Sequence, residues 1–174
     1  FANAQFVRCQ YPLSSSGTGA VGVFNALVDA GLASGHVFSG ATTTPFVLEN
    51  GTIHNTPSLL SSCTLNARNS LLAAITTVQS YTGSGNTQGN FQTTSASGLF
   101  QTVLAGNFYL ASGSPHRNAG ITGINSTLAA ELKQTTTYPP VEITTHFTSA
   151  TTLAPQAPRD TDLPDRGYHY SPVD

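Results

Sequence analysis

The chain has very little charge. Only 8% of its 174 residues are Asp, Glu, Lys or Arg, against about 25% in an average soluble domain. The stretch 69–116 contains none of these four residues. The net charge of -2 leaves no basic surface, so nucleic acid is a poor partner. Disorder is not expected either, because disordered chains combine high net charge with few apolar residues, and 39% of this chain is hydrophobic.

Long apolar runs are also missing. No stretch approaches the 18 or so residues that a membrane-spanning helix needs, so this segment predicts no membrane span. The sequence begins at Phe1 without the charged and apolar regions of a signal peptide. We therefore expect a fragment or a processed product, with any export signal upstream of it.

Cysteine is scarce, since Cys9 and Cys63 are the only two. A structural zinc site would need both of them together with two histidines, and no close Cys or His pair has that spacing. Two interpretations remain open. The thiols can form a disulfide in an oxidising compartment, or they can pack as two small apolar side chains.

Thr, Ser, Asn, Gln and Gly take the place of the missing charges. Thr favours strands, whereas Asn, Ser and Gly favour tight turns. Short apolar runs recur at intervals of roughly 8–12 residues, which is typical of a sandwich, a barrel or a solenoid. The range 17–22 has the GxGxxG spacing of a dinucleotide loop, but no clear strand precedes it and no acidic residue follows at the right distance. We interpret it as a glycine-rich turn.

One segment has a helical pattern. Asn125 or Ser126 can cap a short helix whose Leu128 and Leu132 share one face. The pair of prolines after Tyr138 ends any helical continuation. The tail beyond it is expected to be a non-helical wrap because of its further prolines, among them Pro155, Pro158 and Pro164.

Several motifs from residue 98 onward resemble the ends of bacterial right-handed parallel β-helix proteins of the pectin-lyase-like superfamily. Residues 106–120, GNFYLASGSPHRNAG, resemble the terminal motif GNYxLxxGSPxIDAG, although Arg117 and Asn118 replace its Ile-Asp. Residues 159–170, RDTDLPDRGYHY, are similar to an ending found in large surface proteins of planctomycete- and verrucomicrobium-like bacteria. The resemblance implies a parallel β-helix, a C-terminal position and a surface location. It implies no reaction.

The only acidic cluster is Asp160, Asp162 and Asp165. Alternating carboxylates can supply oxygen ligands to Ca²⁺, so these three residues are a candidate calcium site. The alternative is that they cap turns and pair with Arg159 and Arg166. No other cofactor is expected.

Catalytic candidates are weaker. His116, Arg117 and His169 have no obvious partner in the sequence to tune them, and we interpret His169 as structural. The remaining carboxylates that could form a glycosidase pair are scattered, at Asp29, Glu49, Glu131 and Glu142. Four aromatic residues could stack on sugars, but their strand spacing favours core and cap positions: Tyr81, Phe91, Phe108 and Tyr109. Two glycosylation sequons, at Asn50 and Asn125, are interpreted as turns.

We therefore expect an all-β, right-handed parallel β-helix of about five to seven coils. Coils are expected over residues 1–120, with a helix and a capping wrap of the same domain over residues 121–174. The expected function is a non-catalytic extracellular or cell-surface structural segment. Its expected partners are further copies of itself, as a homo-oligomer or filament, or the rest of a longer parent chain. The alternative is a carbohydrate-binding or polysaccharide-degrading protein with a polysaccharide partner.

Overall fold

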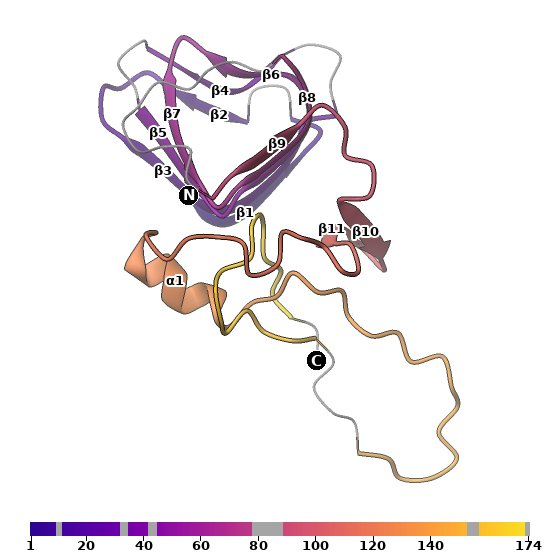
Figure 1. The fold of residues 1–174 in the computed structure, drawn as a ribbon. Coiled ribbons are helices and arrows are strands. Elements are labelled where there is room, and N and C mark those ends of the chain that lie inside the picture. The colour runs from indigo at the N-terminus through magenta and orange to yellow at the C-terminus, as the bar shows by residue number, and fades with distance from the viewer. Residues whose placement is uncertain (10–11, 32–34, 42–44, 78–88, 153–156, 173–174) are drawn as a thin grey trace.

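The fold is a three-sided parallel β-solenoid with a C-terminal segment packed along its flank (Figure 1). The computed structural model describes residues 1–9, 12–31, 35–41, 45–77, 89–152 and 157–172. The short apolar runs of the sequence become strands that stack in parallel from one coil to the next, as expected for a chain rich in Thr and in turn residues. The predicted all-β solenoid fold is confirmed.

Each of the three faces is a stack of parallel strands. The first face stacks strands in the order β1, β3, β6, β8 and β9. The second face stacks β3, β5 and β7, and the third stacks β2, β4 and β6. The bounds of these strands are β1 Ala2–Val7, β2 Leu13–Ser15, β3 Val21–Asp29, β4 His36–Gly40, β5 Pro45–Glu49, β6 Thr52–Ser61, β7 Thr64–Arg68, β8 Leu71–Thr77 and β9 Phe91–Thr93.

Two strands bend around corners and so belong to two faces. β3 pairs with β5 through residues 21–24 and with β6 through residues 27–29. Between these two segments Asn25 has a φ of 44°. Asn55 has a φ of 55° and turns β6 in the same way. Asparagine tolerates this left-handed conformation better than other residues with a side chain, so it can turn a strand without glycine.

Inward-facing apolar side chains fill the triangle. The largest of them pack between neighbouring coils, and the Phe38 and Phe46 rings lie 5.1 Å apart. The thiol of Cys63 packs against this core, and that of Cys9 lies half-buried near the start of the chain. Both cysteines are free, so the structure contains the two separate thiols and not the disulfide. Residues 17–20 form the bend between β2 and β3, and residues 21–22 already belong to β3, so this range leads into a strand and not into a helix.

The solenoid has about three turns, so the expectation of five to seven coils was wrong. The last strand of the solenoid sheet is β9, which ends at Thr93. The chain after it makes an antiparallel hairpin of β10 (Phe100–Val103) and β11 (Gly106–Leu110), which is a separate sheet. Its GNFYL motif forms a strand as expected, but that strand pairs within the hairpin and adds no coil.

The predicted helix is confirmed as α1, Ser126–Leu132. The side chain of Asn125 accepts hydrogen bonds from the Thr127 and Leu128 amides, and Leu128 and Leu132 are buried. Pro158 and Pro164 lie in non-helical chain as expected, as does Pro172, whereas Pro155 lies outside the described residues. Among the residues that the structure describes, no helix has the length and apolar character to cross a membrane.

Candidate functional site

An asparagine ladder runs along one corner of the solenoid. We define it as Asn3, Asn25, Asn50 and Asn69, which the strand registers align from coil to coil. All four have a φ near 50°. The last three are at most 1% exposed, although their side chains point away from the apolar core. Buried amides need hydrogen-bond partners, so another part of the chain must cover this corner.

The C-terminal segment provides those partners. Asn25 Nδ2 donates to the His169 carbonyl at 2.9 Å, and the His169 amide donates to Asn25 Oδ1 at 2.7 Å. Asn69 forms the same two-way pair with the main chain of Ile121, at 2.9 and 2.8 Å. Asn50 Nδ2 donates to the Asp165 carbonyl at 2.8 Å. We call this the ladder interface: the asparagine ladder bonded to residues 118–121 and 164–170.

Close approach at the ladder interface depends on Gly167, which has a φ of 94°. Its amide donates to the Asn69 carbonyl at 2.7 Å. A Cβ atom at this position would lie 2.8 Å from Leu71 Cδ1 and 2.8 Å from Thr52 Oγ1. Glycine is therefore required here for two reasons: it adopts this backbone conformation without strain, and there is no space for a Cβ atom.

A tyrosine cluster seals one side of the interface. The Tyr109 and Tyr170 ring centroids lie 4.2 Å apart, and those of Tyr168 and Tyr170 lie 4.9 Å apart. The Phe108 amide donates to the Tyr170 hydroxyl at 3.1 Å. Burial raises the pKa of Tyr170 to about 12, against the opposing effect of that hydrogen bond. The hydroxyl is therefore neutral at every physiological pH.

A buried acid–histidine centre lies on the far side of the interface from the solenoid core. We define it as Asp160, Asp165 and His169, which are 7%, 3% and 0% exposed. His169 Nε2 lies 2.7 Å from Asp160 Oδ2, and His169 Nδ1 lies 3.0 Å from the Gly167 carbonyl oxygen. A carbonyl only accepts, so Nδ1 carries a proton. The 2.7 Å contact between Nε2 and Asp160 Oδ2 then needs a further proton, because both atoms would otherwise present lone pairs.

Asp165 connects three parts of the C-terminal segment by hydrogen bonds. Its Oδ1 accepts from the Asn118 amide at 2.7 Å, and its Oδ2 accepts from the Thr137 hydroxyl. Its own amide donates to Asp160 Oδ2 at 2.8 Å. Burial raises the pKa of Asp165, and the nearby Asp160 adds to this effect, while the hydrogen bonds from Thr137 and Asn118 oppose it.

Two of the three predicted calcium ligands come together and the third does not. Asp160 and Asp165 share the buried centre, whereas Asp162 is exposed and takes no part in it. Asp160 accepts a hydrogen bond from the backbone amide of Asp165, and Asp165 accepts one from the backbone amide of Asn118. The sequence analysis missed His169 as the third member of the group.

His116 is buried beneath the C-terminal segment, and its surroundings do not resemble those of an active-site base. Its ring packs 4.4 Å from that of Phe91, and its carbonyl accepts from the Arg166 amide at 3.0 Å. Burial lowers the pKa of His116, and the positive charge of Arg166 lowers it further.

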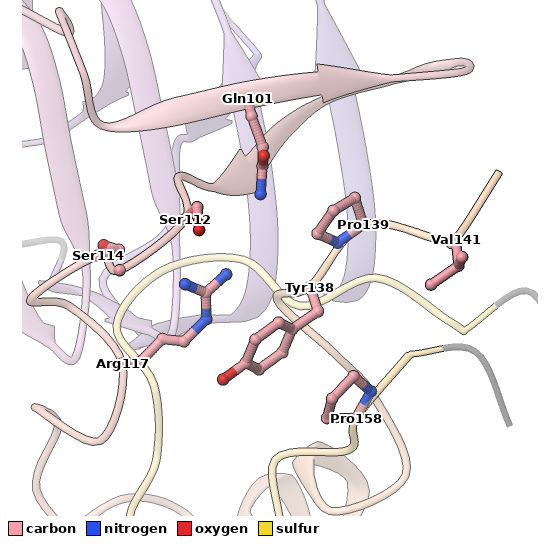
Figure 2. A pocket seen from close by; sticks show the side chains of 9 residues that line it. Gln101, Ser112, Ser114, Arg117, Tyr138, Pro139, Val141 and Pro158 are labelled. Atoms are coloured by element: carbon pink, nitrogen blue, oxygen red, sulfur yellow. The ribbon is translucent and has the colours of Figure 1, made fainter.

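Arg117 lines an open hollow of about 490 Å³ beside the hairpin (Figure 2). Its guanidinium lies 3.8 Å from the centroid of the Tyr138 ring and donates to the carbonyls of Leu110 and Ala111 at 2.9 and 2.8 Å. Ser112, Ser114, Gln101 and two prolines complete the wall. The arrangement presents a fixed cation among hydroxyl and amide groups, and such a site can hold an anionic, polar ligand.

The other candidate carboxylates are committed to the scaffold or lie apart. Asp29 Oδ1 lies 2.8 Å from His54 Nδ1. Glu49 accepts from Arg68 at 3.1 Å and from the Asn125 amide at 2.7 Å, which anchors the start of α1 to the second face. Glu131 accepts from Asn3, and Glu142 is exposed on the tail. Asp29, Glu49 and Glu131 are therefore bonded to other parts of the described chain, whereas Glu142 is exposed.

The aromatic candidates are mainly core and cap residues. Phe108 and Tyr109 are buried in a cluster with Leu27, Tyr168 and Tyr170, and Phe91 packs on His116. Tyr81 lies outside the described residues. The two sequons are turn and cap positions as expected, because Asn50 is fully buried in the ladder and Asn125 caps α1.

In comparisons with protein-family models, with curated proteins and with solved structures, the chain matches none. The geometry above is therefore the basis for any statement about function.

The asparagine ladder itself was missed by the sequence analysis, although a signal for it exists. Asparagines recur at positions 3, 25, 50 and 69, at intervals of one coil. In a solenoid, a polar residue that recurs once per coil occupies one edge of the stack. No other part of the sequence repeats strictly, so the spacing of this one residue type was the only available guide.

Proposed function

We propose that this chain is a non-catalytic structural segment of an extracellular or cell-surface protein. The observation that supports this best is the ladder interface, in which the groups most suited to chemistry, His169 and two carboxylates, are buried and hydrogen-bonded to the scaffold. A surface rich in hydroxyls and amides with only 8% charged residues is consistent with a location outside the cytoplasm.

Self-association is the structural role that we propose. Within the described chain, β1 pairs with β3 alone, so the main-chain groups on its other edge meet no strand. Phe1 and Val7, at the two ends of this edge, are 66% and 55% exposed. An open strand edge with apolar side chains and no nearby run of charges is a template for pairing with another strand. A second copy of the chain can supply that strand.

The test is electron microscopy of the native protein together with its mass by light scattering. Filaments or a closed oligomer would support the proposal, whereas a monomer of 18.1 kDa would overturn it. Val7→Lys adds a charge at the open edge and should dissociate the assembly. Val141→Lys is the matched control, because Val141 is 56% exposed on the tail, and this variant should assemble like the wild type.

The Arg117 hollow favours a second candidate function, the binding of an acidic saccharide. Its cation has no carboxylate partner within the described chain, and hydroxyl and amide side chains surround it. Ser112→Asp should place a negative charge in the hollow and weaken binding of an oligogalacturonate by about tenfold. Ser112→Asn introduces a neutral side chain of the same size as Asp, and this variant should retain binding. Calorimetry that detects no binding to the wild-type protein would remove this candidate.

A further inference from the structure

We propose that Asp160, Asp165 and His169 form a buried site for one divalent transition-metal ion of the Zn²⁺ type. Each of the three residues offers one ligand atom, and these atoms all lie within 4.8 Å of one another. Two ligands of a single ion, each bound at 2.0–2.2 Å, lie at most about 4.4 Å apart. Around a tetrahedral ion such ligand atoms lie about 3.4 Å apart, so the His169–Asp160 pair, now at 2.7 Å, must open and the wider pairs must close by about 1 Å when the ion binds.

His169 is oriented as a metal-binding histidine. Its Nδ1–H donates to the Gly167 carbonyl at 3.0 Å, which fixes the tautomer and leaves the lone pair of Nε2 directed at Asp160. Histidines that bind metals generally donate the other ring N–H to a carbonyl or carboxylate in this way. When an ion binds, it takes the place of the proton that otherwise lies between Nε2 and Asp160 Oδ2.

An independent observation points to a missing ligand. Asp160 Oδ1 is buried and has no hydrogen-bond partner among the described residues, and the Asp160 side chain is only 2% exposed. A buried oxygen without a partner is costly, and native proteins seldom leave one in that state. Because Oδ1 and Oδ2 belong to the same carboxylate, an ion held between Oδ2 and Nε2 can be bound by both oxygens.

The balance of charge supports an ion with two positive charges. Asp160 and Asp165 bring two carboxylates into a centre from which water is excluded, where like charges repel strongly. An ion of charge +2 neutralises both of them, whereas a single proton neutralises only one. The two donors to Asp165, the Asn118 amide and the Thr137 hydroxyl, hold that carboxylate in place for binding.

The donor set selects the kind of ion. Ca²⁺ takes six to eight oxygen ligands, which this buried centre does not offer, and Asp162 is exposed outside it. One imidazole nitrogen with carboxylate oxygens suits Zn²⁺ and similar ions. The proposal therefore replaces the expected calcium ligand Asp162 with His169 and changes the class of metal.

The full chain should be unfolded in urea with EDTA, then refolded with Zn²⁺, Ca²⁺ or EDTA alone, because the site is closed in the folded protein. We expect one zinc ion per chain by elemental analysis after gel filtration. At a free zinc concentration of about 100 times the Kd, we expect a rise in Tm of about 5–10 °C. Ca²⁺ should leave Tm unchanged. Zinc below stoichiometric amounts with no shift in Tm would overturn the proposal.

Two variants and one spectrum locate the ion. Asp160→Asn should abolish the zinc-dependent rise in Tm, and the exposed control Asp162→Asn should retain it in full. If Asp160→Asn does not fold, X-ray absorption of the zinc-loaded wild type decides the matter. We expect nitrogen and oxygen ligands only. Sulfur ligands would mean that Cys9 or Cys63 binds the ion, and would overturn the site proposed here.

Discussion

Asn25 and His169 are separated by 144 residues in the chain and exchange two hydrogen bonds, one in each direction. The side chain of Asn25 thus pairs with the main chain of His169 as one strand pairs with the next. Asn25 in addition turns β3 around a corner with a φ of 44°. One residue therefore serves both the path of the coil and the attachment of the C-terminal segment.

Replacing Asn25 with Gly should lower the free energy of unfolding by about 2–3 kcal/mol. Glycine tolerates the positive φ, so the loss reports the two hydrogen bonds to His169, the bond that Asn25 donates to Asn3, and the buried groups of His169 left without partners. Asn3→Gly is the control, because Asn3 is exposed and its loss should cost less than about 1 kcal/mol. Urea unfolding followed by circular dichroism measures both. Equal losses of unfolding free energy in the two variants would show that Asn25 at the ladder interface contributes no more to stability than the exposed Asn3.

Gly167→Ala should destabilise the protein by several kcal/mol more than Gly113→Ala. Both glycines have positive φ, at 94° and 69°, so both variants carry backbone strain of about 1–2 kcal/mol. A Cβ atom at Gly113 meets no atom within 4 Å, whereas one at Gly167 would meet Leu71 and Thr52. The difference in the urea midpoints therefore isolates the close packing of the tail on the solenoid. Similar midpoints would indicate that the tail can move away at no cost.

Asp165 should make the metal-free protein more stable as the pH falls. Burial raises its pKa in the folded state above the ordinary value of 3.8, so the folded protein binds this proton more tightly than the unfolded chain does. Its contribution is complete below pH 3.8 and is lost as the pH rises through the raised pKa. Asp165→Asn should remove this part of the pH dependence, because an amide can keep the bonds to Asn118 and Thr137. Unfolding in EDTA at a series of pH values tests it, and an unchanged profile in the variant would contradict it.

His116 should have the opposite effect at higher pH. Burial and Arg166 lower its pKa below 6.5, so the unfolded chain binds the proton more tightly. The contribution of His116 to stability is present above pH 6.5 and is lost as the pH falls through the lowered pKa. His116→Phe should keep the ring contact with Phe91 and flatten this part of the profile. If the stability of His116→Phe depends on pH as steeply as that of the wild type just below pH 6.5, another group causes the effect.

The sequence predicted local features better than long-range ones. Helix α1 was predictable because its cap, Asn125, and its buried face, Leu128 and Leu132, lie within eight residues of one another. The coil count was overestimated because the GNFYL strand is indistinguishable in sequence from a strand of another coil. Only its antiparallel pairing with β10 places it outside the solenoid.

The buried centre was predictable only in part. Asp160 and Asp165 were found because acidic residues are rare in this chain. His169 was interpreted as structural, and its position beside Asp160 follows from the path of the tail between them. That path is fixed by the ladder, through bonds that span more than 100 residues. Such pairings have no local signature, so no inspection of the residues near His169 would reveal them.

The ladder interface also changes how the solenoid unfolds. In repeat proteins each coil touches only its neighbours, so end coils can fray while the others stay folded. Here the tail bonds to three successive coils, through Asn69, Asn50 and Asn25. No coil can open without breaking the attachment shared by all three. These C-terminal residues thus convert a stack of separable units into a single cooperative one, and a chain without residues 160–170 would keep only the attachment of Asn69 to Ile121.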